Sequence, residues 1–238
     1  MPFYYYGMFS NRYYMIGTIL VIIAALLAMW AQFKVQSTYS RYKKIPNSRG
    51  MTGAQLAREI LDSEGLYDIQ IFEVNGQLSD HYNPGKKTIN LSKDIYQGTS
   101  IASLAVAAHE CGHAIQYKEK YIPISLRNAI LPIANIGQYL GWIAIFIGLI
   151  FSRTNVAWFG FFAMCGILAF QVVTLPVEFN ASSRALAILK TRYLNEDEYS
   201  GARSMLSAAA MTYVAAMIST LMSMLRIFLI ILGNSRDD

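Results

Sequence analysis

The sequence predicts a mainly α-helical integral membrane protein with four transmembrane helices and a small cytoplasmic α+β domain. Of its 238 residues, 54% are hydrophobic and only 15% are charged, whereas soluble domains carry about 25% charged residues. The apolar residues are also gathered into four runs, each long enough to cross a bilayer. The net charge of +5 is modest and no soluble segment has a basic block with interleaved aromatic residues, so nucleic acid is not an expected partner.

The first apolar run extends from Met15 to Phe33. It follows an aromatic N-terminal stretch, residues 1–13, and tyrosine favours the membrane boundary. A cleaved signal peptide is the alternative interpretation. The run is long for a signal peptide and ends at Trp30, Gln32 and Phe33 rather than at a small-residue cleavage site, so a retained anchor is preferred.

Basic residues flank this run asymmetrically. Only Arg12 precedes it, and five basic residues follow it: Lys34, Arg41, Lys43, Lys44 and Arg49. The positive-inside rule then places the N-terminus outside the cell and the next part of the chain in the cytoplasm. Three further spans would bring the C-terminus outside as well.

The cytoplasmic part begins with a helix signal. Thr52 followed three residues later by Gln55 is a capping-box pattern, which predicts a helix over residues 53–63 that ends at Gly65. Three short strands are expected next, over residues 68–74, 77–82 and 87–91. Asn75-Gly76 predicts that the first two strands form a hairpin.

A second helix is predicted from about Ser100, and it contains the pattern HExxH at residues 109–113. Residues four apart lie on one face of a helix, so His109 and His113 can both turn a ring nitrogen toward one Zn²⁺. Glu110 then lies beside the metal, where it can take a proton from a zinc-bound water. A helix, a small sheet and an HExxH helix follow one another in the order expected of a zincin.

The alternative interpretation of this motif is a buried helix with two satisfied histidines. Gly112 argues against it, because glycine is a poor helix former and makes sense where another element approaches closely. Of the two cysteines, Cys111 is interpreted as a packing residue and Cys165 lies in an apolar run. They do not form a disulfide framework.

His81 is the third histidine of the chain. It is either a donor to the transition-state oxyanion or a substrate contact, or else a histidine near a turn that is held by Asp80. Tyr82 is a second candidate for the donor role.

The remaining spans follow the HExxH helix. Residues 121–129 are amphipathic, 130–151 and 156–175 form a transmembrane hairpin, and 208–232 form the last span. The predicted organisation is therefore the following: an N-terminal segment and first span (1–34), a cytoplasmic domain (35–120), a hairpin (121–175), cytoplasmic helices (176–205), and a last span with a tail (206–238).

A catalytic zinc needs a third protein ligand. Glu178 is the candidate, because a carboxylate that emerges from an apolar run is costly unless it is paired. Pro176 predicts that a helix starts at this residue, with Glu178 in its first turn. Ala181 and Ser182 on the same face are small enough to let this helix lie against the HExxH helix, and Arg184 could anchor a carboxylate or a polar group of a peptide.

These motifs together resemble those of a known family. Residues 101–119 and 171–189, with Asp80-His81-Tyr82 upstream, resemble the YugP-like neutral zinc metallopeptidases of bacterial membranes. More distantly, HExxH followed two spans later by Glu-x-x-Ala is similar to the HtpX and CAAX-prenyl-protease group of gluzincins. The resemblance implies a peptidase with one zinc per chain, the ligands His109, His113 and Glu178, and Glu110 as the general base. That group has Asp after the Ala, whereas Ser182 stands here, so no role is carried over to position 182.

The sequence therefore predicts a multi-pass zinc metalloendopeptidase of the cell membrane, with its active site at the cytoplasmic face. Its partners would be membrane lipid and a protein or peptide substrate, and its role would lie in membrane-protein quality control. His81 and Arg184 are the candidates for substrate or oxyanion contacts. The alternatives are a non-catalytic scaffold with a structural zinc and a site-two-type intramembrane protease, and a homo-oligomer is left open.

Overall fold

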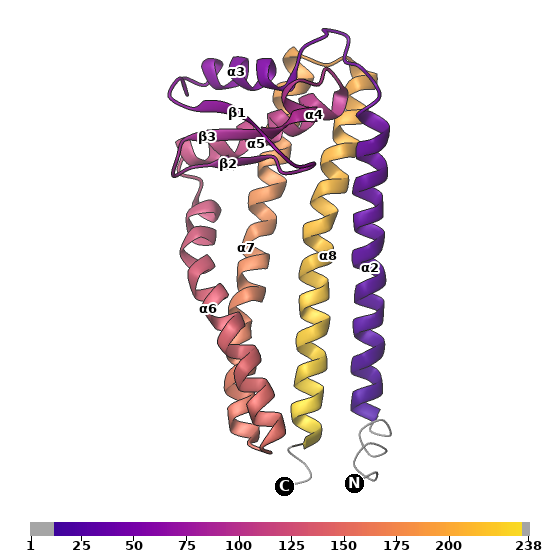
Figure 1. Ribbon diagram of the computed structural model, residues 1–238, viewed down its shortest axis with the longest axis vertical. Helices are drawn as coiled ribbons and strands as arrows, with labels where there is room; N and C mark the ends of the chain where they lie inside the picture. The colour runs from indigo at the N-terminus through magenta and orange to yellow at the C-terminus, as the bar shows by residue number, and fades with distance from the viewer. Residues whose placement is uncertain (1–11, 235–238) are drawn as a thin grey trace. The chain divides into compact units, whose positions relative to one another are not determined.

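The computed structural model describes residues 12–234, so the expectation that the aromatic stretch before Arg12 lies at the membrane boundary falls outside the described residues. Within this range the chain is mainly helical, with one small sheet (Figure 1). Its elements are α2 (Arg12–Tyr42), α3 (Gly53–Ser63), β1 (Gln70–Val74), β2 (His81–Asn83), β3 (Thr88–Ser92), α4 (Lys93–Tyr96), α5 (Ile101–Lys118), α6 (Ile122–Ile150), α7 (Thr154–Arg192) and α8 (Glu196–Asn234).

Four helices, α2, α6, α7 and α8, are long and apolar enough to cross a membrane. α2, α7 and α8 contain their predicted apolar runs and continue beyond them, and α6 covers all but the last residue of the run 130–151 and begins before it. Large apolar side chains on them are exposed, among them Phe33, Tyr139 and Phe146, at 74%, 78% and 67%. Such exposure suits a hydrocarbon environment and would be costly in water.

The prediction that a helix starts at Pro176 is wrong. α7 runs without a break from Thr154 to Arg192, and Pro176 lies inside it. A proline leaves the carbonyl four residues earlier, that of Val172, without its helical donor, whereas a break would leave several backbone groups without partners. In an apolar segment a continuous helix therefore costs less free energy than a broken one.

The described residues form two compact units. The first contains the described parts of Met1–Ala31, Ser125–Leu175 and Thr212–Asp238. In this unit the Ser219 hydroxyl of α8 donates to the Ala24 carbonyl of α2 over 3.2 Å. Seven residues along each helix, Arg226 packs over Gly17, so the two helices run antiparallel. The Arg226 guanidinium lies 5.5 Å from the ring centre of Tyr14.

The second unit contains Gln32–Ile124 and Pro176–Met211. Its sheet has the order β1-β3-β2, with β1 parallel and β2 antiparallel to the central β3 (Figure 1). The predicted hairpin of the first two strands is therefore wrong. Ile89 and Leu91 of β3 are fully buried, whereas β1 is mostly exposed, so the most buried strand lies at the centre.

The segment that was expected to turn tightly forms a longer loop. Gly76 and Leu78 have positive φ, and the Ser79 hydroxyl contacts the carbonyl oxygens of Asn75 and Gly76 at 3.1 Å each. Asp80 then accepts hydrogen bonds from the amide and hydroxyl of Ser92 at the end of β3. The loop thus carries the chain from β1 to the other edge of β3.

Both helix starts predicted for this unit are confirmed. Thr52 and Gln55 form the reciprocal capping box of α3, and the Ser100 hydroxyl accepts from the Ser103 amide at the start of α5. Gly65 takes a positive φ of 71° just after α3, where a side chain would be strained. α3, α5 and β3 share one core, which fixes α5 against the sheet.

Candidate metal centre

The two histidines of the motif lie side by side on α5. Their ring centres are 4.7 Å apart and the rings are nearly perpendicular, at 82°. This is the result of the four-residue spacing on an unbroken helix.

Glu178 of α7 completes a group of three. Its Oε2 lies 3.4 Å from Nε2 of His109 and 3.6 Å from Nε2 of His113, and the three candidate ligand atoms lie within 4.8 Å of one another. Two ligands of a tetrahedral zinc ion are about 3.4 Å apart, given bonds of about 2.0–2.2 Å. The side chains of all three residues are largely buried. The donor set and its spacing therefore fit a zinc ion.

A close approach of two helices makes this group possible. A Cβ atom on Gly112 would lie only 2.6 Å from the carbonyl oxygen of Ala181, so any side chain at position 112 would push α7 away from α5. Ala181 itself is fully buried. The predicted need for a glycine inside the motif and for small residues after Glu178 is confirmed.

Each histidine has a second polar contact through its other ring nitrogen. Nδ1 of His109 lies 3.1 Å from the Ser182 hydroxyl, and Nδ1 of His113 lies 3.0 Å from Oε1 of Gln116. An Nδ1–H that donates to these oxygens leaves Nε2 with its lone pair toward Glu178, as zinc binding requires. Sequence reasoning missed both partners, although Ser182 follows Glu178 by one helical turn and Gln116 follows His113 by three residues.

Glu110 is held beside the histidines by the sheet. It is 7% exposed, and its Oε2 accepts a hydrogen bond of 2.8 Å from the backbone amide of Tyr82 in β2. This amide points away from β3, so it takes no part in the hydrogen bonds between β2 and β3. Tyr82 packs its ring edge-on against Tyr117 of α5, so β2 and α5 are joined by both contacts.

The structure does not bring His81 to the three-residue group. His81 is exposed, and its ring nitrogens contact the backbone carbonyl of Ser79 and the side-chain amide of Asn90. Alternation along β2 puts it on the opposite face from Tyr82. The expectation that Asp80 holds it is wrong, because Asp80 is turned toward Ser92 instead.

Arg184 also has protein partners. Its Nε donates to Oδ1 of Asn180 over 2.7 Å, and its guanidinium pairs with the Glu119 carboxylate over 2.6 Å. Of the two roles that the sequence left open for Arg184, this contact corresponds to the anchoring of a nearby carboxylate.

Burial and neighbouring charges shift the pKa values of His113, Cys111 and Asp80. Burial lowers the pKa of His113, but the hydrogen bond to Glu178 and the charge of Glu110 outweigh it, so that the pKa is raised in the metal-free protein. Burial raises the pKa of the Cys111 thiol, which agrees with a packing role, and both cysteines are free. Burial also raises the pKa of Asp80, and the nearby charge of Glu110 adds to this effect.

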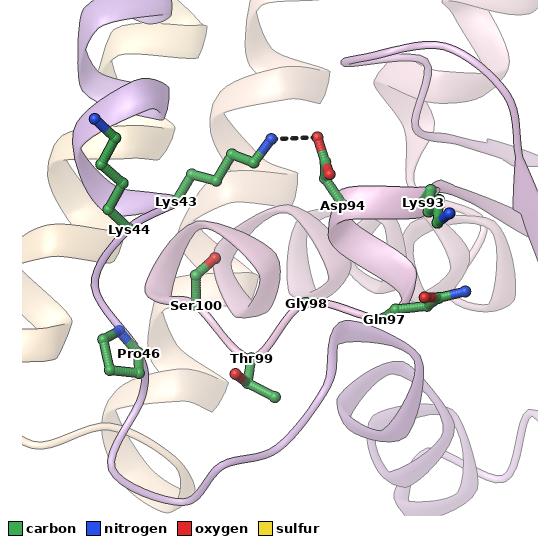
Figure 2. A pocket seen from close by; sticks show the side chains of 9 residues that line it. All are labelled: Lys43, Lys44, Pro46, Lys93, Asp94, Gln97, Gly98, Thr99 and Ser100. Carbon is green, nitrogen blue, oxygen red and sulfur yellow. Dashed lines mark hydrogen bonds and ion pairs between the residues drawn. The ribbon is translucent and has the colours of Figure 1, made fainter.

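A pocket of about 370 Å³ lies elsewhere in the second unit. Its lining comes from the segment that follows α2 and from the segment between Lys93 and Ser100. Figure 2 shows that Lys43 reaches across its wall toward Asp94, with which it forms an ion pair. None of the three candidate ligands lines it. The pocket is therefore separate from the candidate metal centre.

The fold and the group of two histidines and a glutamate thus define a helical protein that can hold a zinc ion beside a buried carboxylate. A family described as "Putative neutral zinc metallopeptidase" matches residues 17–232. The "Putative membrane protease YugP" of Bacillus subtilis (strain 168) is 43% identical over 222 residues, which cover 92% of this chain and 98% of that protein. No solved structure matches. The chain belongs to the YugP-like family, as the sequence predicted, and this family implies a zinc cofactor.

The metal content of purified protein tests the ligand set. We expect about one zinc per chain in the wild type and a clear loss of zinc in His113→Ala and Glu178→Ala, because removal of one of three ligands greatly weakens binding. Glu196→Ala is the matched control and should keep its zinc, since that carboxylate is exposed and pairs with Lys190. Elemental analysis of the detergent-solubilised chain gives the answer. Retention of zinc in Glu178→Ala would show that another residue is the third ligand.

Proposed function

We propose that this protein is a membrane-bound zinc metalloendopeptidase of the gluzincin type, which hydrolyses peptide bonds with one zinc per chain. The observation that carries the proposal is the group formed by His109, His113 and Glu178, with Glu110 held next to it. Membership of a family described as neutral zinc metallopeptidases supports it. The name of the Bacillus subtilis relative, a membrane protease, points the same way.

In this proposal zinc, when bound, supplies Lewis acidity that makes a water nucleophilic near neutral pH and polarises the scissile carbonyl. Glu110 is the general base. Its Oε2 accepts from the Tyr82 amide, which fixes the carboxylate. The other oxygen, Oε1, would receive the proton of the attacking water. The same carboxyl group then gives the proton to the leaving amine.

The edge of the sheet supports a peptide as the substrate. β2 lies at the end of the strand order and pairs with β3 alone. An extended peptide can add to such an edge through main-chain hydrogen bonds. The Tyr82 amide on this edge is already bonded to Glu110, so a peptide would pair with the Tyr82 carbonyl, which points the same way, and would run past the proposed base.

Two alternatives are less well supported. A site-two-type protease would have HExxH in a spanning helix, but among residues 12–234 the candidate spans are α2, α6, α7 and α8, and α5 is not one of them. A scaffold with a structural zinc would close the site with four protein ligands. The candidate group within the described residues offers three.

We expect Glu110→Gln to slow peptide hydrolysis strongly while zinc stays bound. General-base catalysis contributes about 10²–10⁴-fold, and glutamine is nearly the same size but cannot take the proton. The assay uses zinc-loaded, detergent-solubilised full chain with quenched fluorescent peptides, and zinc content is measured in parallel. Cleavage at the wild-type rate in Glu110→Gln would exclude this mechanism, and a zinc-bound wild type with no hydrolysis of any peptide would favour the scaffold.

The orientation that we propose puts the metal centre at the cytoplasmic face and both termini outside. It rests on the basic residues that follow the first span. In a background with Cys111 and Cys165 replaced, an impermeant thiol reagent added to intact cells should label Ser152→Cys, in the connection between α6 and α7. It should not label Gln97→Cys, which follows α4. The reverse pattern would invert the topology.

A role in membrane-protein quality control follows from a peptidase site that lies close, along the chain, to an apolar run. Glu178 comes three residues after the predicted span that ends at Leu175. Cells without the protein should then turn over misfolded membrane proteins more slowly, as measured by pulse-chase, and Glu110→Gln should not restore the rate. Unchanged turnover would remove this role.

A further inference from the structure

One buried side chain connects two of the candidate zinc ligands. Gln116 is fully buried, and its amide makes three hydrogen bonds. Oε1 faces Nδ1 of His113 at 3.0 Å, while Nε2 donates to the carbonyl of Val177 over 2.8 Å and to Oδ1 of Asn180 over 3.0 Å. Val177 immediately precedes Glu178, so the same amide contacts one ligand directly and the backbone next to another.

The chemistry of the partners fixes which way this amide points. The Val177 carbonyl can only accept, so the Gln116 atom that faces it must be the NH₂ group. Arg184 has only donors, so the Asn180 atom that it contacts must be the oxygen, which again requires the NH₂ of Gln116. Two independent contacts therefore give the same orientation.

This orientation determines the tautomer of His113. With its NH₂ turned to α7, Gln116 presents an oxygen to His113, and an amide oxygen can only accept. The proton of a neutral His113 must then be on Nδ1, and Nε2 has the lone pair on the side of Glu178. Glu119 in turn pairs with Arg184, which holds Asn180. The contacts therefore run from Glu119 at the surface through Asn180 and Gln116 to His113.

We propose that Gln116 is a positioning residue of the metal centre, which selects the zinc-binding tautomer of His113 and fixes the Glu178 turn of α7 against α5. It does not touch the substrate or the reacting atoms. The inference depends on the proposed zinc site but not on peptidase activity.

Zinc affinity is the direct test, measured by competition with a chelator on the full chain in detergent. Gln116→Leu should weaken zinc binding about 10–100-fold, the usual cost of losing a partner of a metal-bound histidine. Gln116→Glu keeps an acceptor for His113 but lacks the donor to Val177, so its affinity should fall between those of Gln116→Leu and the wild type. The visible spectrum of the Co²⁺-loaded protein should change in Gln116→Leu, because the ligand geometry changes.

Asn47→Leu is the matched control. Asn47 is also buried and also ties segments together, since its side-chain amide donates to the carbonyls of Met51 and Thr99. It should lower the unfolding temperature of the metal-free protein and leave the zinc affinity and the Co²⁺ spectrum unchanged. This separates a positioning role from a general loss of stability.

The inference is overturned if Gln116→Leu binds zinc within about threefold of the wild type, or if Asn47→Leu weakens binding equally. Should Gln116→Leu fail to fold, Gln116→Glu and Asn180→Ala take its place, because each removes part of the contact to α7. A zinc affinity equal to that of the wild type in both variants would overturn the inference. A wild type that binds zinc but cleaves no peptide would refute the proposed function and leave this inference standing.

Discussion

The contact between Gly112 and Ala181 is the constraint on which the candidate metal centre depends. Two helices can approach this closely only where one of them has no side chain, and here that position falls inside the HExxH motif itself. The approach brings the Glu178 carboxylate to within 3.4 and 3.6 Å of the two imidazole nitrogens. A wider spacing would leave the Glu178 carboxylate too far from the two histidines to share a metal ion with them. The site therefore forms only when α5 packs on α7.

The parts of this site that follow from local rules could be predicted from the sequence. The positions of His109, Glu110 and His113 depend only on helical periodicity, and Glu178 was found because a carboxylate beside an apolar run needs a partner. The two caps of α3 and α5 also depend on residues within one turn. These predictions needed no knowledge of how distant segments meet.

The predictions that failed depend on distant contacts. Asn75-Gly76 is a good turn sequence, yet β3 separates β1 from β2, because the burial of Ile89 and Leu91 outweighs the local preference for a hairpin. Pro176 is a good first residue of a helix, yet the apolar surroundings keep α7 continuous. Gln116 and Ser182 were missed because their roles exist only once α5 and α7 lie together.

The distance along the chain between the candidate ligands has a consequence for folding. His113 and Glu178 are 65 residues apart (178 − 113), and the interval contains all of α6 and much of α7. A metal ion held by both residues would act as a cross-link that closes this loop, and it would remove conformational entropy from the unfolded chain. The entropic model for a loop of this length gives about 4 kcal/mol as an upper bound, since a hairpin that has already inserted in a bilayer has lost part of that freedom. Loss of the metal would thus loosen the link between two distant parts of the chain as well as stop any chemistry.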